Sequence, residues 1–231
     1  IYMRKRTDGR PYEFEAVVAE KKCASCGLCI GACDFHAIDL PDRTEKEINI
    51  EIDNLLRFPS NEPKILAVVC GYGIQMKGLI DPETRALKEM PNCRVMILPC
   101  VAMLQPSMME HAFISGADGI FISGCEVNDC HYREGNRWLE QRLLNIRPPV
   151  LKKKAVNIDK VRVVWLSKIH TKDFFTELKG FNDELKLKKG SGYTIKHRFI
   201  KNRLTPIGIS VLTIAAVITV YLSDVAYTFF K

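Results

Sequence analysis

The segment Ile65-Leu-Ala-Val-Val-Cys70 is an unbroken apolar run that ends on a cysteine. Three more apolar runs bounded by turn residues follow it, at Val95–Cys100, Gly119–Cys125 and Val161–Ser167. Runs of this length without alternation are typical of strands buried on both faces, as in a parallel sheet. Helix-like stretches lie between and after them, at residues 75–90, 106–115, 134–146 and 171–186. The alternation predicts an α/β fold with an open parallel sheet and flanking helices over residues 64–187.

Three of these runs end on cysteine, which places three thiols at one edge of the predicted sheet. Cys70, Cys100 and Cys125 each end a strand, and ligand sites of open parallel sheets lie outside the carboxyl ends of the strands. Cys130 follows in the next loop and completes a set of four thiolates. By spacing alone, this set suits a [2Fe–2S] cluster, a [4Fe–4S] cluster or structural zinc. Cysteine is also common as a small apolar residue at buried strand ends, but that explains three successive positions badly.

A tighter cysteine motif lies upstream, in the segment Cys23-Ala-Ser-Cys26-Gly-Leu-Cys29-Ile-Gly-Ala-Cys33. The spacing C-x2-C-x2-C-x3-C is that of bacterial ferredoxins, in which the thiolates hold a [4Fe–4S] cluster. Gly27 lets backbone amides approach the cluster sulfides closely. Zinc is the main alternative, but zinc sites usually use two separated pairs rather than four closely spaced cysteines. Residues 1–60 are therefore predicted to be a small α+β ferredoxin-like module with its linker.

The fourth cysteine of this motif has two possible roles. In two-cluster ferredoxins the fourth cysteine ligates the other cluster. Cys33 therefore either completes the cluster of the first three cysteines or reaches a second cluster that an upstream segment supplies. Asp34 replaces the proline that usually follows the fourth cysteine. The chain begins at Ile1 rather than at methionine, which predicts processing or a missing upstream part.

The last residues of the chain are far more apolar than the rest. No charge occurs from Ile207 to Leu222, and the apolar segment reaches the length of about 20 residues that a membrane span needs. A buried core helix is the alternative, but core helices rarely run so long without a polar face. Residues 205–230 are therefore predicted to be one transmembrane helix. Asp224 would lie in the far headgroup zone, with proton handling as the less favoured role.

The formal net charge of +7 comes largely from residues just before this helix. The basic residues of that cluster are Lys186, Lys188, Lys189, Lys196, Arg198, Lys201 and Arg203. Such a cluster is typical of the cytoplasmic flank of a membrane span, so residues 1–203 are predicted to lie on the cytoplasmic side of the cytoplasmic membrane. No basic patch with interleaved aromatic residues occurs elsewhere, so nucleic acid is not an expected partner. Residues 43–63 are predicted to be a linker, and residues 188–204 a basic juxtamembrane segment.

The sequence contains no motif of an enzyme active site. The segment Cys70-Gly-Tyr-Gly-Ile lacks the third glycine of a dinucleotide-binding fingerprint. There is no phosphate-binding loop, no HExxH zinc motif and no Ser–His–Asp candidate. The two C-x-x-C pairs that bind nickel in hydrogenase large subunits are also missing. The chain is therefore predicted to have no catalytic residues of its own and to leave redox chemistry to its cofactors.

Residues 64–187 resemble the delta-subunit family of methyl-viologen-reducing hydrogenases. The most specific match is the run Asp129-Cys-His-Tyr-Arg-Glu-Gly-Asn136. Shorter matches are Ala67-Val-Val-Cys70, Val95-Met-Ile-Leu-Pro-Cys100, Gly116-Ala-Asp-Gly-Ile and Gly124-Cys125. The resemblance implies a [2Fe–2S] cluster held by Cys70, Cys100, Cys125 and Cys130. The family usually opens its motif with C-x-x-C, whereas Gly73 stands at the second position here, and Cys93 is off pattern and interpreted as a spare buried thiol.

Members of that family pass electrons between a hydrogenase or other dehydrogenase and a flavin-containing, heterodisulfide-reductase-like subunit. The resemblance therefore implies an iron–sulfur electron-transfer subunit of a membrane-associated oxidoreductase complex. A membrane partner, such as a quinone-reactive cytochrome b, is inferred from the anchor alone. The alternatives are an iron–sulfur redox sensor and a zinc-binding membrane scaffold. His131 beside Cys130 is either a ligand or proton partner of the cluster or, the favoured interpretation, a hydrogen-bond donor to a carbonyl or neighbouring domain.

Overall fold

The computed structural model describes residues 1–41, 43–152, 156–187 and 194–196. Its centre is a six-stranded sheet with the strand order β4-β5-β3-β6-β7-β8. The strands are β3 (Ile65–Cys70), β4 (Ala86–Leu87), β5 (Met90–Leu98), β6 (Gly119–Gly124), β7 (Val161–Trp165) and β8 (Thr194–Lys196). All neighbouring pairs are parallel except β4 with β5. The predicted α/β architecture with a largely parallel sheet is confirmed.

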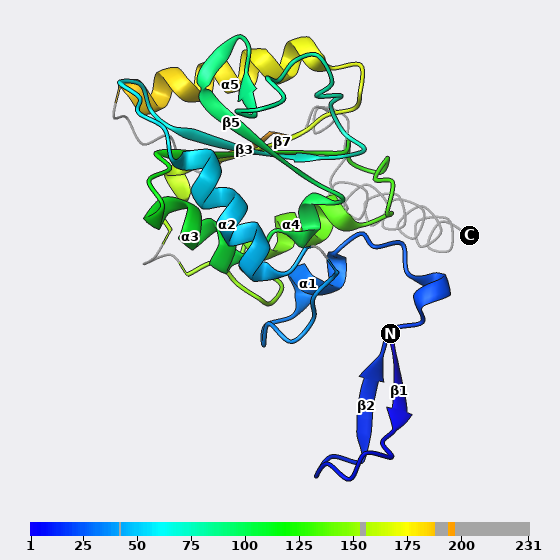
Figure 1. Ribbon diagram of the computed structural model, residues 1–231. Coiled ribbons are helices and arrows are strands. Elements are labelled where there is room, and N and C mark those ends of the chain that lie inside the picture. Colours follow the sequence, from blue (N-terminus) through cyan, green and yellow to red (C-terminus); the bar gives the residue numbers. More distant parts are fainter. Residues whose placement is uncertain (42, 153–155, 188–193, 197–231) are drawn as a thin grey trace, which may run out of the picture. The chain divides into compact units, whose positions relative to one another are not determined.

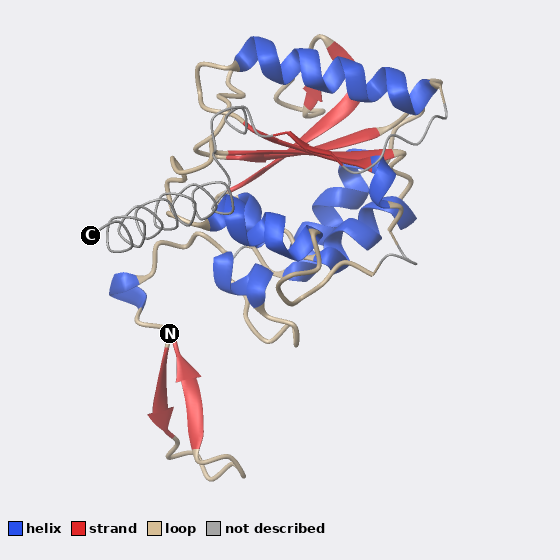
Figure 2. Cartoon of the chain, turned by 180° about the vertical axis from the view of Figure 1, so that it is seen from behind, coloured by secondary structure: helices blue, strands red, loops and turns tan. Residues whose placement is uncertain are grey.

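Helices cover both faces of this sheet (Figures 1 and 2). One face carries α2 (Glu45–Leu56), α3 (Pro106–Ile114) and α4 (Gly135–Leu143), and the other carries α5 (Thr171–Lys186). The three helices predicted from residue 106 onward match α3, α4 and α5 to within three residues at each end. Burial on both sides explains why β3 is apolar at every position, because both faces of a strand in such a sheet contact a helix layer.

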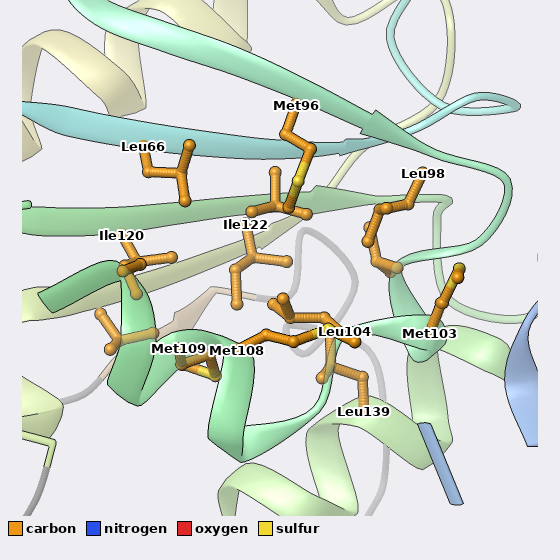
Figure 3. Close-up of a cluster of buried hydrophobic side chains, with 14 of the residues drawn as sticks. Leu66, Met96, Leu98, Met103, Leu104, Met108, Met109, Ile120, Ile122 and Leu139 are labelled. Atoms are coloured by element: carbon orange, nitrogen blue, oxygen red, sulfur yellow. The ribbon is translucent and has the colours of Figure 1, made fainter. Parts of the chain in front are cut away.

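The two faces of the strands bury two separate clusters of apolar side chains. Along β3, Leu66 and Val68 belong to the cluster under α2–α4, whereas Ala67 and Val69 belong to the cluster under α5. Figure 3 shows the first cluster, in which sheet residues interdigitate with side chains of α3, α4 and the segment before α3. This cluster contains the buried methionines Met96, Met103, Met108 and Met109. The cluster under α2–α4 also contains Cys70 and Cys125, so it extends to the edge of the sheet where these cysteines lie.

Two predictions about local structure are wrong. Residues 75–90 form no helix: they contain turns and the short strand β4, and β5 begins at Met90. The physical cause is turn chemistry, since the Asp81 carboxylate accepts from the backbone N–H of Thr84 at 2.7 Å and Gly78 has a φ of +82°. Residues 43–63 are not a plain linker, because they contain α2. Its start is a capping box, in which Thr44 Oγ1 accepts from the Glu47 N–H and the Glu47 carboxylate accepts from the Thr44 N–H.

The N-terminal residues form a two-stranded hairpin and two short helical segments. An antiparallel hairpin consists of β1 (Tyr2–Lys5) and β2 (Phe14–Val17). A 3₁₀ turn, η1 (Glu20–Lys22), leads into the first cysteine motif, and α1 (Leu28–Ala32) lies within that motif. α1 packs against η2 (Val101–Met103), a 3₁₀ turn that directly follows Cys100.

Within the described ranges, no helix is both long enough and apolar enough to cross a membrane. The predicted transmembrane helix at 205–230 lies outside the described residues, as does most of the basic segment at 188–204.

Candidate metal centres

The strand order reverses at β3, and two cysteines mark that point. β5 lies on one side of β3 and β6 on the other, and in open parallel sheets the crevice at such a switch point is the usual ligand site. Cys70 is the last residue of β3, and Cys125 directly follows β6. Their sulfur atoms are 3.5 Å apart and buried. The sheet topology therefore brings together two cysteines that are 55 residues apart in the sequence.

Cys100 and Cys130 join this pair through hydrogen bonds between thiols. Hydrogen bonds from Cys100 and Cys125 lower the pKa of Cys130, and the same bonds raise the pKa of the two donors. The hydrogen bond from Cys125 lowers the pKa of Cys70 to about 7. The four predicted cysteines thus form one connected group. Cys93 does not belong to it, because its buried side chain lies in the apolar cluster under α5, on the opposite face of the sheet.

The loop after Cys125 is held by two residues of the run that carries the family resemblance. Asn136 is buried, and its side-chain amide donates to the carbonyls of Cys125 and Glu126, both at 3.0 Å. Gly135 begins α4 beside the thiols: a Cβ on this residue would overlap Cys100 Sγ and lie 3.5 Å from Cys130 Sγ. The absence of a side chain at 135 therefore provides the space that the sulfur of Cys100 occupies.

The chemistry of this donor set fits an iron–sulfur cluster. In the part of the chain that the structure describes, no three His, Cys, Asp or Glu side chains are arranged to hold a single metal ion. Four cysteines in a partly enclosed group, with no carboxylate or histidine among them, are the ligands of [2Fe–2S] and [4Fe–4S] clusters. Structural zinc takes the same set of four thiolates.

The first cysteine motif surrounds the start of α1. Backbone amides point at two of its sulfurs, from Ser25 to Cys23 at 3.4 Å and from Ala37 to Cys33 at 3.3 Å. Gly27, the residue before α1, has a φ of +76°, a conformation that favours glycine. All nine cysteines of the chain are free thiols. Hydrogen bonds from backbone amides to sulfur are also what tunes the potential of iron–sulfur clusters.

The two cysteine sets lie against the same part of the core. Cys29 from the first set and Cys130 from the second both pack on the cluster under α2–α4. Gly27 lies against the turn that follows Cys100, because a Cβ at Gly27 would come within 2.6 Å of the Met103 side chain. The sequence did not predict this contact, because the spacing of cysteines along the chain says nothing about which loops meet in space.

His131 stacks on an aromatic ring. Its ring centroid is 3.6 Å from that of Tyr72 with an interplanar angle of 7°, and Tyr132 meets both rings edge-on. Burial raises the pKa of the Tyr132 phenol, with smaller contributions from Tyr72 and from the thiols of Cys26 and Cys100. Tyr132 therefore lies within electrostatic range of one cysteine of each set.

Arg142 and Gln105 are functional candidates that the sequence analysis missed. Both side chains are 1% exposed and donate to backbone carbonyls of the first cysteine motif. A signal for Arg142 does exist: it lies at helical spacing from the buried Leu139, so it interrupts an apolar stripe of α4.

Comparisons with known proteins give a consistent assignment. Residues 65–187 match the family described as "Methyl-viologen-reducing hydrogenase, delta subunit". The chain is 28% identical over 106 residues to an iron-sulfur subunit of the F420-non-reducing hydrogenase of Archaeoglobus profundus, a match that covers 46% of this chain and 76% of the relative. It is 29% identical over 126 residues to the corresponding iron-sulfur subunit of the F420-non-reducing hydrogenase vhc of Methanococcus voltae, covering 54% and 85%.

A longer match reaches beyond the 65–187 region. It is to one subunit of the Ferredoxin/F(420)H(2)-dependent CoB-CoM heterodisulfide reductase of Methanosarcina acetivorans. That protein is 28% identical over 199 residues, which cover 74% of this chain and 25% of the relative. The family region itself spans more than half of the chain and contains the four cysteines at the switch point. On this ground the chain belongs to the family of the delta subunit of methyl-viologen-reducing hydrogenase.

Proposed function

We propose that this chain is an iron–sulfur electron-transfer subunit of a membrane-associated oxidoreductase complex. The observation that carries the proposal is the group of four cysteines at the switch point of the sheet, next to a ferredoxin-type motif in the same chain. The names of the relatives support it, since they are subunits of a hydrogenase and of a heterodisulfide reductase. The absence of an active-site motif from the sequence agrees with a relay that has no catalytic residues of its own.

Each cysteine set has a defined task in this proposal. Cys70, Cys100, Cys125 and Cys130 hold a [2Fe–2S] cluster, and Cys23, Cys26, Cys29 and Cys33 hold a [4Fe–4S] cluster. When bound, these groups accept and release single electrons. Asn136 fixes the loop that carries Cys125 and Cys130. Cys70, Cys100 and Cys125 are buried, whereas Cys23 is exposed, and the apolar surroundings of the buried thiols limit solvent access to the cluster that they would hold.

The division of the chain follows from these sites. Residues 1–60 form the ferredoxin-like module with its linker, of which α2 packs on the sheet, and residues 64–187 form the delta-subunit-like α/β domain. Residues 188–204 are the basic juxtamembrane segment and 205–230 the membrane anchor, with the N-terminal domains on the cytoplasmic side. The expected partners are a hydrogenase or dehydrogenase, a flavoprotein or heterodisulfide-reductase-like subunit, and a membrane component such as a quinone-linked cytochrome b. The uncharged run from Ile207 to Leu222 supports the membrane part of this proposal.

Single-cysteine variants test whether the two sets hold two clusters. Cys26→Ala is expected to remove the [4Fe–4S] signal and keep the [2Fe–2S] signal, and Cys125→Ala is expected to do the reverse, because each removes one of four ligands. Low-temperature electron paramagnetic resonance (EPR) of the dithionite-reduced protein measures both signals. Cys93→Ala is the matched control, since this buried thiol lies on the other face of the sheet. Loss of either signal in the control, or survival of both signals in Cys125→Ala, would refute the assignment.

The alternatives give other results in the same experiment. A zinc-binding scaffold would contain stoichiometric zinc and give no signal in any variant. A redox sensor would show the clusters but would purify without a flavin- or haem-containing subunit, whereas a relay is expected to co-purify with one.

A further inference from the structure

Arg142 is a buried cation without an anionic partner in the described part of the chain. Its side chain is 1% exposed and lies on the inner face of α4. No ion pair of the described residues includes it, and its Nε has no hydrogen-bond partner. Burial lowers the pKa of its guanidinium to about 10, so the group stays charged at neutral pH. Buried arginines are normally paired with carboxylates, because an uncompensated charge away from water is costly.

The guanidinium instead bridges the two cysteine regions. One Nη atom donates to the carbonyl of Gly31 in α1, and the other donates to the carbonyl of Ala102 in η2. Gly31 precedes Cys33 by two residues, and Ala102 follows Cys100 by two. A Cβ at Gly31 would overlap the Ala102 carbonyl oxygen, so the two segments touch at backbone level. The planar fork of arginine is suited to hold two carbonyls at once.

Gln105 makes a second connection between the same segments. Its side-chain amide donates to the carbonyl of Ile30 at 2.6 Å and to that of Cys33 at 3.3 Å. The carbonyls at the end of a helix lack intrahelical partners, and here side chains of the α/β domain supply the donors for α1. Gln105 carries no charge. A substitution at Gln105 therefore removes hydrogen bonds to α1 without changing the charge near the cysteines.

A bound cluster would supply the negative charge that the guanidinium of Arg142 lacks among the described residues. A cluster bound by four thiolates carries a net negative charge, and each added electron makes it more negative. A fixed positive charge beside the cluster favours the reduced state and so raises the reduction potential.

We infer that Arg142 is a positioning residue that serves both cysteine sets: its guanidinium fixes α1 against η2 and offsets the negative charge of the cluster that Cys100 helps to hold. This inference rests on the proposed function. With both clusters bound, the two cysteine sets would hold them at a fixed separation within one chain. One electron would then pass from one cluster to the other, and no bond would be formed or broken.

The test compares four variants of the full chain by spectroelectrochemistry and EPR after iron quantification. Arg142→Gln removes the charge and the fork, Arg142→Lys keeps the charge, and Gln105→Leu removes the neutral hydrogen bonds. Arg137→Gln is the matched control, since Arg137 lies on the same helix with an exposed side chain paired with Glu134. Two quantities are read: the reduced-to-oxidised ratio of the [2Fe–2S] cluster at a fixed potential, and the relaxation enhancement that each reduced cluster causes in the other.

Arg142→Gln is expected to lower that ratio about tenfold, which corresponds to about 59 mV for a one-electron couple, and to weaken the relaxation enhancement. Arg142→Lys is expected to keep the ratio and weaken the enhancement, and Gln105→Leu to do the same. The control is expected to match the wild type in both. If Arg142→Gln does not load iron, the Arg142→Lys and Gln105→Leu pair still decides whether the two side chains fix α1 against η2, and Arg142→Lys still shows whether a positive charge at 142 keeps the ratio.

The inference is overturned if Arg142→Gln keeps the wild-type ratio, if Arg142→Lys shifts it strongly, or if Gln105→Leu and Arg142→Lys leave the enhancement unchanged. A wild-type chain that contains no cluster would instead refute the proposed function, so the two failures are distinguishable.

Discussion

Gly135→Ala is expected to abolish loading of the [2Fe–2S] cluster while the [4Fe–4S] cluster stays in place. A Cβ at 135 overlaps the sulfur of Cys100, and Gly135 is the first residue of α4, so the backbone there is fixed by the helix. The sulfur must move out of the group of four thiols, because overpacking of a filled site is relieved by displacement of its neighbours. We expect a destabilisation of about 1–3 kcal/mol and a fall in iron from about six to about four atoms per chain.

Iron quantification and EPR measure this effect. The matched control is Gly180→Ala in α5, where an added Cβ meets no atom within 4 Å. This control should keep both clusters and gain up to about 1 kcal/mol of stability, because alanine is the better helix former. Full [2Fe–2S] loading in Gly135→Ala would show that Cys100 does not hold the cluster from the position seen here.

Deletion of residues 204–231 is expected to move the protein from the membrane fraction to the soluble fraction. The deleted segment includes the uncharged run from Ile207 to Leu222, whose insertion as a transmembrane helix would be effectively irreversible. The full chain should therefore resist extraction with alkaline carbonate, whereas the shortened chain should be released. Both proteins are expected to keep their clusters, since all eight predicted ligands precede residue 204.

The basic segment that remains after the deletion provides an internal control. Residues such as Lys201 and Arg203 can still attract the shortened chain to anionic lipids, but salt screens that attraction. Membrane binding of the shortened chain that survives high salt, or release of the full chain by carbonate, would contradict the anchor.

The sequence predicts the parts of the fold that depend on unbroken apolar runs. Ile65–Cys70 is a strand with the predicted ends, because its length and its position between turn residues leave no other element. The helix at 45–56 was missed although Thr44 and Glu47 form a capping box and Ile48 and Ile52 follow at helical spacing. A helix was wrongly predicted at 75–90, because apolar residues recur there. The hydrogen bond from the Thr84 N–H to the Asp81 carboxylate instead stabilises a turn.

The candidate sites likewise contain a part that the sequence predicts and a part that it does not. Cysteines at strand ends could be placed at one sheet edge in advance, because parallel topology fixes where those ends lie. The hydrogen bond from Arg142 to α1 could not be predicted in advance, because it depends on the approach of segments that are 111 residues apart. Contacts of that kind are set by tertiary packing, about which the local pattern carries no information.

The most direct test of the account is low-temperature EPR of the anaerobic, dithionite-reduced full chain, with iron and zinc quantified on the same sample. Distinct [2Fe–2S] and [4Fe–4S] signals with about six irons per chain are expected. About ten irons would mean that Cys33 serves a second cubane. Stoichiometric zinc without an EPR signal would contradict the electron-transfer function and leave a zinc-binding scaffold.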